Sequence, residues 1–314
     1  MTAATGTRAT VSTKGYWTNE RREALHGILF SLPGILGFLV WVLGPMVASL
    51  YLAGTRYSVT SPPVWVGLEN FRFAFFEDNL FWKSLGRTFY YAFVMVPLSL
   101  SGSLLAASLL NQHLKFTTLW RTLFYLPSLT PVVASAMLWR YLLNTDVGLV
   151  NHLLWTLFHI KGPNWLGASA WAVPALMLIA LWGSIGGGRM IIFLAGLQGV
   201  PQELYEAADI DGADKLAKFL NVTLPLLTPT IFFNLVLGVI GALQVFALAF
   251  IGTNGGPNYA TYFYALHVYN KAFVTFDMGY ASALSWLFMA ILLFFTIIQF
   301  RSSSRWVFYM GEGR

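Results

Sequence analysis

The sequence predicts an all-α, polytopic membrane protein. Of its 314 residues, 57% are hydrophobic and only 10% are charged, whereas a soluble domain typically carries about 25% charged residues. Apolar stretches of about 20 residues or more recur along the chain, and each is long enough, as a helix, to cross a hydrocarbon core. The chain therefore belongs in a bilayer, with membrane lipid around it.

We expect six membrane-spanning helices. Their approximate ranges are 27–53, 88–111, 122–143, 170–196, 224–251 and 280–300. The first apolar run is too long for the hydrophobic region of a cleavable signal peptide, so we interpret it as a membrane helix behind an N-terminal tail, residues 1–26. The membrane domain then covers 27–305 and a C-terminal tail covers 306–314.

The distribution of basic residues predicts the orientation. Six spans place both chain ends on one side, where eleven Lys and Arg residues lie, against six on the other side. By the positive-inside rule, both tails and the connection between spans 4 and 5 are cytoplasmic. The net charge of +6 comes with no dense basic run, so it indicates topology and anionic lipid rather than nucleic acid.

Several chemistries are excluded or not expected. The chain has no cysteine, which excludes disulfides, thiolate catalysis and cysteine metal sites. Its five histidines are scattered, so we expect no metal site. The expected spans carry no catalytic constellation, so we expect no catalytic residues and no intramembrane enzyme.

Prolines inside the expected spans allow two interpretations. Each proline removes a backbone donor and kinks a helix, and membrane helices tolerate this where neighbours or water satisfy the freed carbonyl group. Proline is also common in ordinary membrane helices; the functional alternative is a set of broken helices around a translocation path. The prolines are Pro33, Pro45, Pro97, Pro127, Pro131 and Pro174.

A short charged segment separates spans 4 and 5. Residues 203–218 carry seven charges in sixteen positions. Pro201 suits the first position of a helix, and Asp211-Gly212 predicts a turn that divides the segment into two short helices. The second helix has an apolar stripe formed by Ala213, Leu216, Ala217 and Leu220. Small residues and a stripe are what a docking surface needs, and a solvated loop needs neither.

The same segment resembles a known family. The pattern E-A-A, three residues, G, nine residues, I-x-L-P is typical of the EAA loop of ABC importer permeases. It is matched by Glu206-Ala207-Ala208, Gly212, Val222 and Leu224-Pro225, with Val222 in place of Ile. The stretches 67–72, 121–127 and 191–198 are similar to the carbohydrate (maltose-type) branch, in its first permease subunit. The resemblance covers about Leu25 to Arg305.

The resemblance implies a type I ABC importer permease fold with a coupling loop over 201–225. In this family the EAA helices seat in a cleft of a separate ATPase, and Glu206 can pair with a basic residue there. The residues implied in coupling are Glu206, Ala207, Ala208, Asp211, Gly212, Leu224 and Pro225.

The implied partners are a second homologous permease, an ATP-binding cassette ATPase dimer and an extracytoplasmic substrate-binding protein, assembled at a bacterial-type cytoplasmic (inner) membrane. ATP and Mg²⁺ belong to the ATPase. This chain has no GxxxxGK[ST] motif, and its glycine cluster, 183–189, lacks the Lys and the Ser or Thr of a phosphate cradle. We therefore expect a chain that is not itself an enzyme.

Four residues are expected on the substrate path: Gly188, Arg189, Gln244 and Phe246. An arginine inside a span is functional or paired by default; for Arg189 the alternative is snorkelling to the interface or pairing with a helix carbonyl. Gln244 and Phe246 offer the amide and the ring that a sugar needs, and a hydrogen bond between helices is an equal alternative for Gln244. We expect Arg140 to snorkel to the surface.

The function expected is import of a sugar, a di- or oligosaccharide, with ATPase closure coupled through the EAA helices to alternating access. A glycerol-phosphate or polyol permease is the alternative within the family. A secondary transporter driven by an ion gradient is the alternative outside it, but it would need intramembrane Asp or Glu as ion ligands, and the expected spans contain none.

Overall fold

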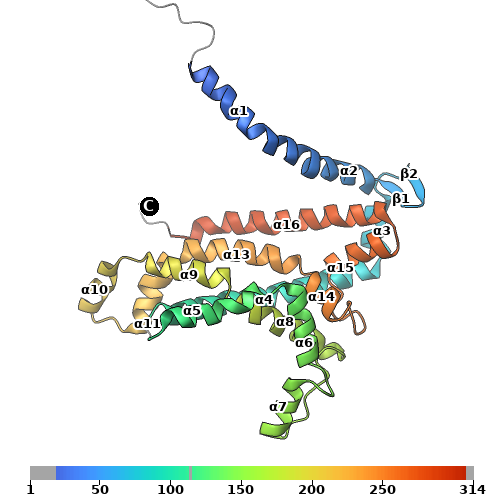
Figure 1. Ribbon diagram of the computed structural model, residues 1–314. Helices are drawn as coiled ribbons and strands as arrows, with labels where there is room; N and C mark the ends of the chain where they lie inside the picture. The colour runs from blue at the N-terminus through green and yellow to red at the C-terminus, as the bar shows by residue number, and fades with distance from the viewer. Residues whose placement is uncertain (1–18, 113–114, 309–314) are drawn as a thin grey trace, which may run out of the picture.

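The computed structural model describes residues 19–112 and 115–308. Figure 1 shows long helices lying side by side, with both described chain ends on the same side of the molecule as α10 and α11. The all-α prediction is confirmed; the one sheet in the described chain is a two-stranded antiparallel hairpin of β1 (Thr55–Ser58) and β2 (Ser61–Trp65). We call the side with α10 and α11 the coupling end and the side with β1 and β2 the hairpin end.

Three segments are unbroken helices of membrane-spanning length and composition: Arg22–Ala53, Asn79–Leu110 and Met278–Trp306. The first consists of α1 (Asn19–Phe38), a π-helical turn (Leu39–Leu43) and α2 (Gly44–Ala53). The second is α4 and the third is α16. The second begins nearer residue 79 than 88 because Asp78 caps it, accepting hydrogen bonds from the N–H groups of Leu80 and Phe81 at 2.8 and 3.2 Å.

Three more segments are pairs of helices that are bent at a short break. The bends measure 95° between Thr117–Leu129 and Val132–Leu142, 49° between Ser169–Ser184 and Gly188–Gln198, and 66° between Lys215–Leu226 and Thr228–Leu243. With each pair counted as one crossing, length and composition give six spans, as the sequence predicts. The pairs correspond to spans 3, 4 and 5.

The broken spans and the segments between them are built from short elements. They are α5 (Thr117–Tyr125), a 3₁₀ turn (Leu126–Leu129), α6 (Val132–Leu142), α7 (Leu149–Phe158), α8 (Ser169–Ser184), α9 (Gly188–Gln198), α10 (Gln202–Ile210), α11 (Lys215–Lys218), a π turn (Phe219–Thr223), α12 (Leu224–Leu226), α13 (Thr228–Leu243) and α14 (Ala247–Gly252). At the hairpin end lie α3 (Glu69–Phe76), α15 (Tyr264–Tyr269) and a further π turn (Asn270–Val274).

Prolines act differently at different positions. Pro127 lies in the 3₁₀ turn and Pro131 directly before α6, so the break in span 3 falls where neither residue can donate to a helix. Pro97 and Pro174, by contrast, lie inside the continuous helices α4 and α8. The break that follows Gln244 in span 5 has no proline at all.

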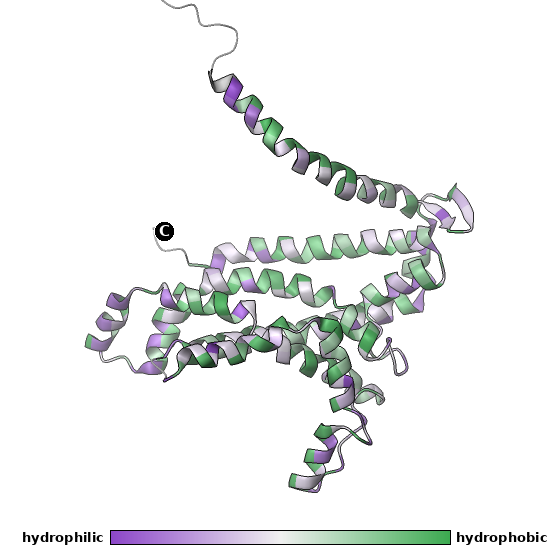
Figure 2. Cartoon of the chain, viewed as in Figure 1, coloured by the Kyte–Doolittle hydropathy of each residue, from purple (hydrophilic) through white to green (hydrophobic). Residues whose placement is uncertain are grey.

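The first span stands apart from the other helices. Its most apolar window is 0% buried, and it contacts the body through α2, where Trp286 of α16 donates a hydrogen bond to Ser49 at 3.1 Å. Figures 1 and 2 show α1 leading away from the bundle as a mostly hydrophobic helix. Phe30 and Trp41 are 87% and 80% exposed.

The largest core lies among α4, α8, α13 and α14, with Leu176 and Phe263 fully buried in it. A buried polar cluster ties the hairpin end together. Oδ2 of Asp78 accepts a hydrogen bond from the Tyr280 hydroxyl at 2.8 Å, and lies 3.1 Å from Nε2 of His267 and 3.9 Å from Nζ of Lys271. This cluster joins the start of α4, the segment before α16, and α16 itself.

Candidate functional site

The charged segment folds as the helix–turn–helix that the sequence predicts. α10 ends at Ile210, and Gly212 takes a φ of +74°, a conformation that glycine adopts without a Cβ penalty. Asp214 then caps α11 by accepting a hydrogen bond from the Ala217 N–H at 2.7 Å. The Asp211-Gly212 turn is therefore confirmed.

Two contacts hold the helices of this segment against each other. Lys218 forms an ion pair with Asp209 across the turn. The hydroxyl groups of Tyr205 on α10 and Thr223 on the π turn lie 2.8 Å apart. The segment is thus an ordered unit, joined through α12 to α13 without a loop.

Apolar side chains on this unit are left uncovered by the described chain. Ile210 is 88% exposed, Leu216 is 63% exposed and Leu220 is 48% exposed. Exposed apolar side chains gathered beside charges mark a surface for another protein. In Figure 2 this unit forms a hydrophilic tip, with some hydrophobic positions, on otherwise hydrophobic helices.

The predicted coupling residues divide into two groups. The first group lies on the tip, where four residues are exposed and one residue of α10 is half-buried. The second group is two half-buried residues of α12, next to the 66° bend between α12 and α13. The exposed residues of the first group are Glu206, Ala207, Asp211 and Gly212, and its half-buried residue is Ala208; the second group is Leu224 and Pro225. Their role in coupling remains a prediction.

A cavity of about 420 Å³ lies among the broken spans, within the range of about 300–1,000 Å³ that small-molecule sites occupy. We call it the membrane cavity. Its walls come from the break in span 3, the end of α8, the break after α13, and Tyr91 of α4; they include Pro127, Ser128, Thr130, Ser135, Gly183, Ser184, Gln244 and Phe246. Interrupted helices are tolerated at membrane depth where they line a cavity.

Glycines allow two of these breaks to approach each other. A Cβ on Gly186 would lie 1.8 Å from the carbonyl oxygen of Phe124, and one on Gly187 would lie 3.0 Å from Cβ of Ser128. Only glycine therefore fits at position 186, where the break between α8 and α9 approaches the end of α5. The bend of 49° between α8 and α9 falls at this glycine run.

The structure brings two of the four predicted path residues into the membrane cavity. Gln244 and Phe246 both line it. The Gln244 side-chain amide has no hydrogen bond to another described residue, so the described chain does not show the helix–helix bond that was its alternative. The Phe246 ring stacks on Phe250 with the centroids 5.4 Å apart and the planes at 13°.

Gly188 and Arg189 are not among the residues that line this cavity. Arg189 is half-buried, and its Nη1 donates a hydrogen bond to Oγ of Ser99 on α4 at 2.6 Å. A Cβ on Gly238 of α13 would lie 3.3 Å from Nη2 of Arg189. Arg189 therefore lies at the junction of spans 2, 4 and 5, and its place on the substrate path stays a prediction.

Sequence reasoning did not find the hydroxyl groups of the cavity wall. Ser128, Thr130 and Ser135 follow Pro127 in sequence. The sequence does contain a signal for these groups, namely Pro127 and Pro131. Two prolines so close together predict a break in the helix, and polar groups beside such a break must face protein or a cavity rather than lipid.

An ordered, uncovered helix–turn–helix joined to a span that is broken beside a cavity is the arrangement expected of a membrane permease subunit. The comparisons with known proteins agree. Residues 99–307 match the family described as binding-protein-dependent transport system inner membrane component, and the chain belongs to this family.

Relatives and solved structures cover nearly the whole chain. The probable ABC transporter permease protein YesP of Bacillus subtilis is 42% identical, over 93% of this chain and 94% of its own. The trehalose/maltose transport system permease protein MalF of Thermococcus litoralis is 35% identical, over 89% of this chain and 94% of its own. A crystal structure of a bacterial alginate ABC transporter has a matching chain with a TM-score of 0.80 and 22% identity, covering 91% of this chain and 96% of that one, which shows the shared fold. The chain is thus a multi-pass membrane permease, and such permeases are not themselves enzymes.

Proposed function

We propose that this chain is a permease subunit of an ATP-driven importer that carries a di- or oligosaccharide delivered by an extracytoplasmic binding protein. One observation carries the proposal: α11, its π turn, α12 and α13 run without a loop from the uncovered tip to Gln244 at the membrane cavity. A rigid element that joins a docking surface to a substrate cavity transmits motion from one to the other.

The partner at the tip would be an ATPase dimer that binds ATP and Mg²⁺. Closure of that dimer would pull α10 and α11, and the exposed Glu206 carboxylate would pair with a basic residue of the ATPase. Ile210 and Leu216 would fill an apolar cleft, which would stabilise the docked state by about 25 cal/mol for each Å² of apolar surface removed from water.

The partner within the membrane would be a second, homologous permease. The uncovered apolar side chains of the first span support it, since a helix that packs so little on its own chain is free to pack on another. The orientation proposed puts the coupling end and both chain ends in the cytoplasm, where the excess of Lys and Arg lies.

The sugar class is supported by the chemistry of the membrane cavity. Gln244 offers an unengaged amide, Ser and Thr hydroxyl groups surround it, and Phe246 offers a ring face. The relative from Thermococcus litoralis is named for trehalose and maltose transport. A polyol or glycerol phosphate would meet the same groups; the stacked pair of Phe246 and Phe250 favours a sugar ring.

The test is mass spectrometry of the complex purified through a tag on this chain in mild detergent. Recovery of a second permease and an ATPase, with a binding protein that still holds a saccharide, is the expected result. Recovery of this chain alone, from membranes in which those subunits are present, would contradict the proposal and favour the secondary transporter.

A further inference from the structure

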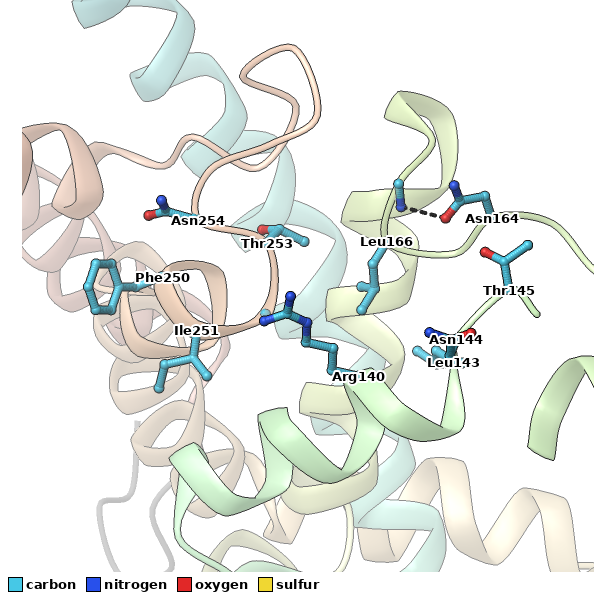
Figure 3. Close-up of a pocket in the computed structure, with 12 residues that line it drawn as sticks. Arg140, Leu143, Asn144, Thr145, Asn164, Leu166, Phe250, Ile251, Thr253 and Asn254 are labelled. Carbon is cyan, nitrogen blue, oxygen red and sulfur yellow. Dashed lines mark hydrogen bonds between the residues drawn. The ribbon is translucent and has the colours of Figure 1, made fainter. Parts of the chain in front are cut away.

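A second cavity, of about 580 Å³, lies toward the hairpin end. It is bounded by the end of α6, the turn after it, the turn before α8, and the end of α14 (Figure 3). The polar residues in its wall are Arg140, Asn144, Thr145, Asn164, Thr253 and Asn254. None of its lining residues is Asp or Glu.

Asn144 and Asn164 each use the side-chain oxygen in hydrogen bonds to the backbone, which leaves the side-chain NH₂ group available to a ligand. Oδ1 of Asn144 accepts hydrogen bonds from the N–H groups of Asp146 and Val147 at 2.9 and 3.1 Å. Oδ1 of Asn164 accepts one from the Gly167 N–H at 2.8 Å, the dashed line in Figure 3. A backbone N–H can only donate, so in each amide the oxygen is engaged and the NH₂ group has no partner in the described chain.

Arg140 adds a positive charge to these donors. It lies in the last turn of α6, and Figure 3 shows it between the end of α14 and the turn that carries Asn164. The side chain is exposed and makes no hydrogen bond or ion pair with another residue of the described segments. Asp146, the acid nearest to it in sequence, does not line the cavity.

The same helices contribute to the walls of both cavities. Val132 and Ser135 of α6 line the membrane cavity, and Arg140 of the same helix lines the second one. The stacked rings of Phe246 and Phe250 are likewise divided, with Phe246 in the wall of the membrane cavity and Phe250 in the wall of the second one. A chain-like ligand would therefore find donors in one cavity and a ring-stacking surface leading to the other.

We propose that the second cavity binds the carboxylate of an acidic saccharide, with Arg140 as the residue that selects it; this rests on the proposed function of saccharide import. A guanidinium group presents a planar fork that matches a carboxylate with two hydrogen bonds. The two amide NH₂ groups donate to the remaining acceptors. A neutral sugar, which has hydroxyl groups but no anionic group, would leave the arginine without a carboxylate to match its fork.

The test is a binding measurement on the purified complex in nanodiscs of phosphatidylcholine. The probes are trigalacturonate and its methyl ester, which differ in charge and share the same sugar rings. We expect the acid to bind at least about tenfold more tightly than the ester, Arg140→Gln to abolish that difference, and Arg140→Lys to keep part of it, because charge-assisted bidentate bonds exceed neutral ones by that order. Arg72→Gln, at an exposed arginine outside the cavity, is the matched control and should change nothing.

Three outcomes would overturn the proposal. They are equal affinity for both probes, no binding of trigalacturonate by the wild type, and an unchanged preference in Arg140→Gln with unaltered unfolding temperature. A lipid headgroup is the other source of an anionic group. If Arg140→Gln instead lowers the phosphatidylglycerol retained in native mass spectra and leaves trigalacturonate binding unaltered, the cavity holds lipid and the proposal fails.

Binding is measured without ATP, so it is read separately from import. A complex that hydrolyses ATP in response to its binding protein, yet shows no charge preference, refutes the acidic-saccharide site alone. Charge-selective binding by a chain that recruits no ATPase refutes the importer alone.

Discussion

Arg189 is a charged side chain within span 4 that is hydrogen-bonded to a neighbouring helix. Its guanidinium group bonds to Ser99 on α4 and faces the backbone of Gly238 on α13. An arginine in a span is costly unless it is paired, and one hydroxyl group meets only part of its donor capacity. The side chain is therefore a tie between helices, and any further role depends on what meets its remaining donors.

We expect Arg189→Gln and Ser99→Ala to lower the stability of the chain by about 1.5–3 kcal/mol each, the usual contribution of a hydrogen bond to a charged group. The stability lost in the double variant should be smaller than the sum of the two single losses, because both changes remove the same hydrogen bond. Thermal unfolding in detergent measures this. Unaltered stability in both variants, together with a raised KM for uptake in Arg189→Gln alone, would put Arg189 on the substrate path.

The buried cluster at the hairpin end makes stability depend on pH. Burial lowers the pKa of His267 to about 4, more than the carboxylate of Asp78 raises it. The pKa of Asp78 is raised by burial, but the Tyr280 hydroxyl, His267, the Leu80 N–H and Lys271 hold it below its usual value. His267 is therefore neutral near pH 7, with Nδ1 3.2 Å from the Tyr262 hydroxyl, and Asp78 is ionised.

Acid should weaken this end of the protein. A histidine whose pKa is about 4 in the fold and 6.5 in the unfolded chain binds more protons when unfolded, so stability is full above pH 6.5 and falls as the pH drops toward 4. The loss is on the order of 3 kcal/mol. Unfolding temperatures across this range measure it. In His267→Gln, which cannot titrate, the acid-induced fall should shrink; an equal fall in both proteins would contradict this explanation.

At the scale of elements, the breaks in spans 3 and 4 depend on each other. The carbonyl group of Phe124 and Gly186 meet so closely that no side chain fits between them. Because this contact sets how near the two breaks lie, it sets the shape of the membrane cavity between them.

Gly186→Ala should therefore destabilise the chain by about 1–3 kcal/mol or more, as overpacking of a close contact does. Gly86→Ala in α4 is the matched control, because a Cβ there meets nothing within 4 Å, and it should leave stability unaltered or slightly raised. Thermal unfolding of the two variants tests this. If Gly186→Ala is as stable as the control, the breaks are not held by this contact.

Sequence reasoning found the spans and the helix–turn–helix but not every break. Hydropathy alone locates six apolar runs, and Asp211-Gly212 alone locates the turn, because both signals are local. The break after Gln244 has neither proline nor glycine at the break itself, so nothing local announces it. The start of α4 at Asn79 follows from the cap at Asp78, which hydropathy does not register.

The candidate sites divide in the same way. A contiguous motif predicted the coupling role of the segment 201–225. The walls of both cavities join residues that are far apart in sequence, such as Asn144 with Asn254, so only the fold brings them together. Arg140 shows the consequence. The sequence predicts that it snorkels to the surface, and its side chain is exposed, but only the fold places it in one cavity wall with the amide groups of Asn144 and Asn164.

At the scale of the whole molecule, a continuous run of helices joins the uncovered tip to the membrane cavity. The uncovered tip lies at the coupling end, the membrane cavity lies between the break in span 3, the end of α8 and the break after α13, and α12 and α13 connect the tip to the cavity. The first span contacts the bundle through α2, and α1 leads away from it (Figure 1), so the apolar side chains of α1 are left uncovered for a partner. If the proposed ATPase drives this motion, ATP hydrolysis must change which side of the membrane the cavity faces.

That change of access can be measured directly, because the chain contains no cysteine. With cysteine-free partners, Gln244→Cys provides a single thiol in the cavity, and a membrane-impermeant maleimide applied from either side of proteoliposomes reports its access. Val64→Cys, in the exposed hairpin, is the control and should react from one side in every state. We expect the cavity thiol to react from the cytoplasmic side without nucleotide and from the opposite side after trapping with ATP and vanadate. Reaction from the same side in both states would contradict coupling between the tip and the cavity.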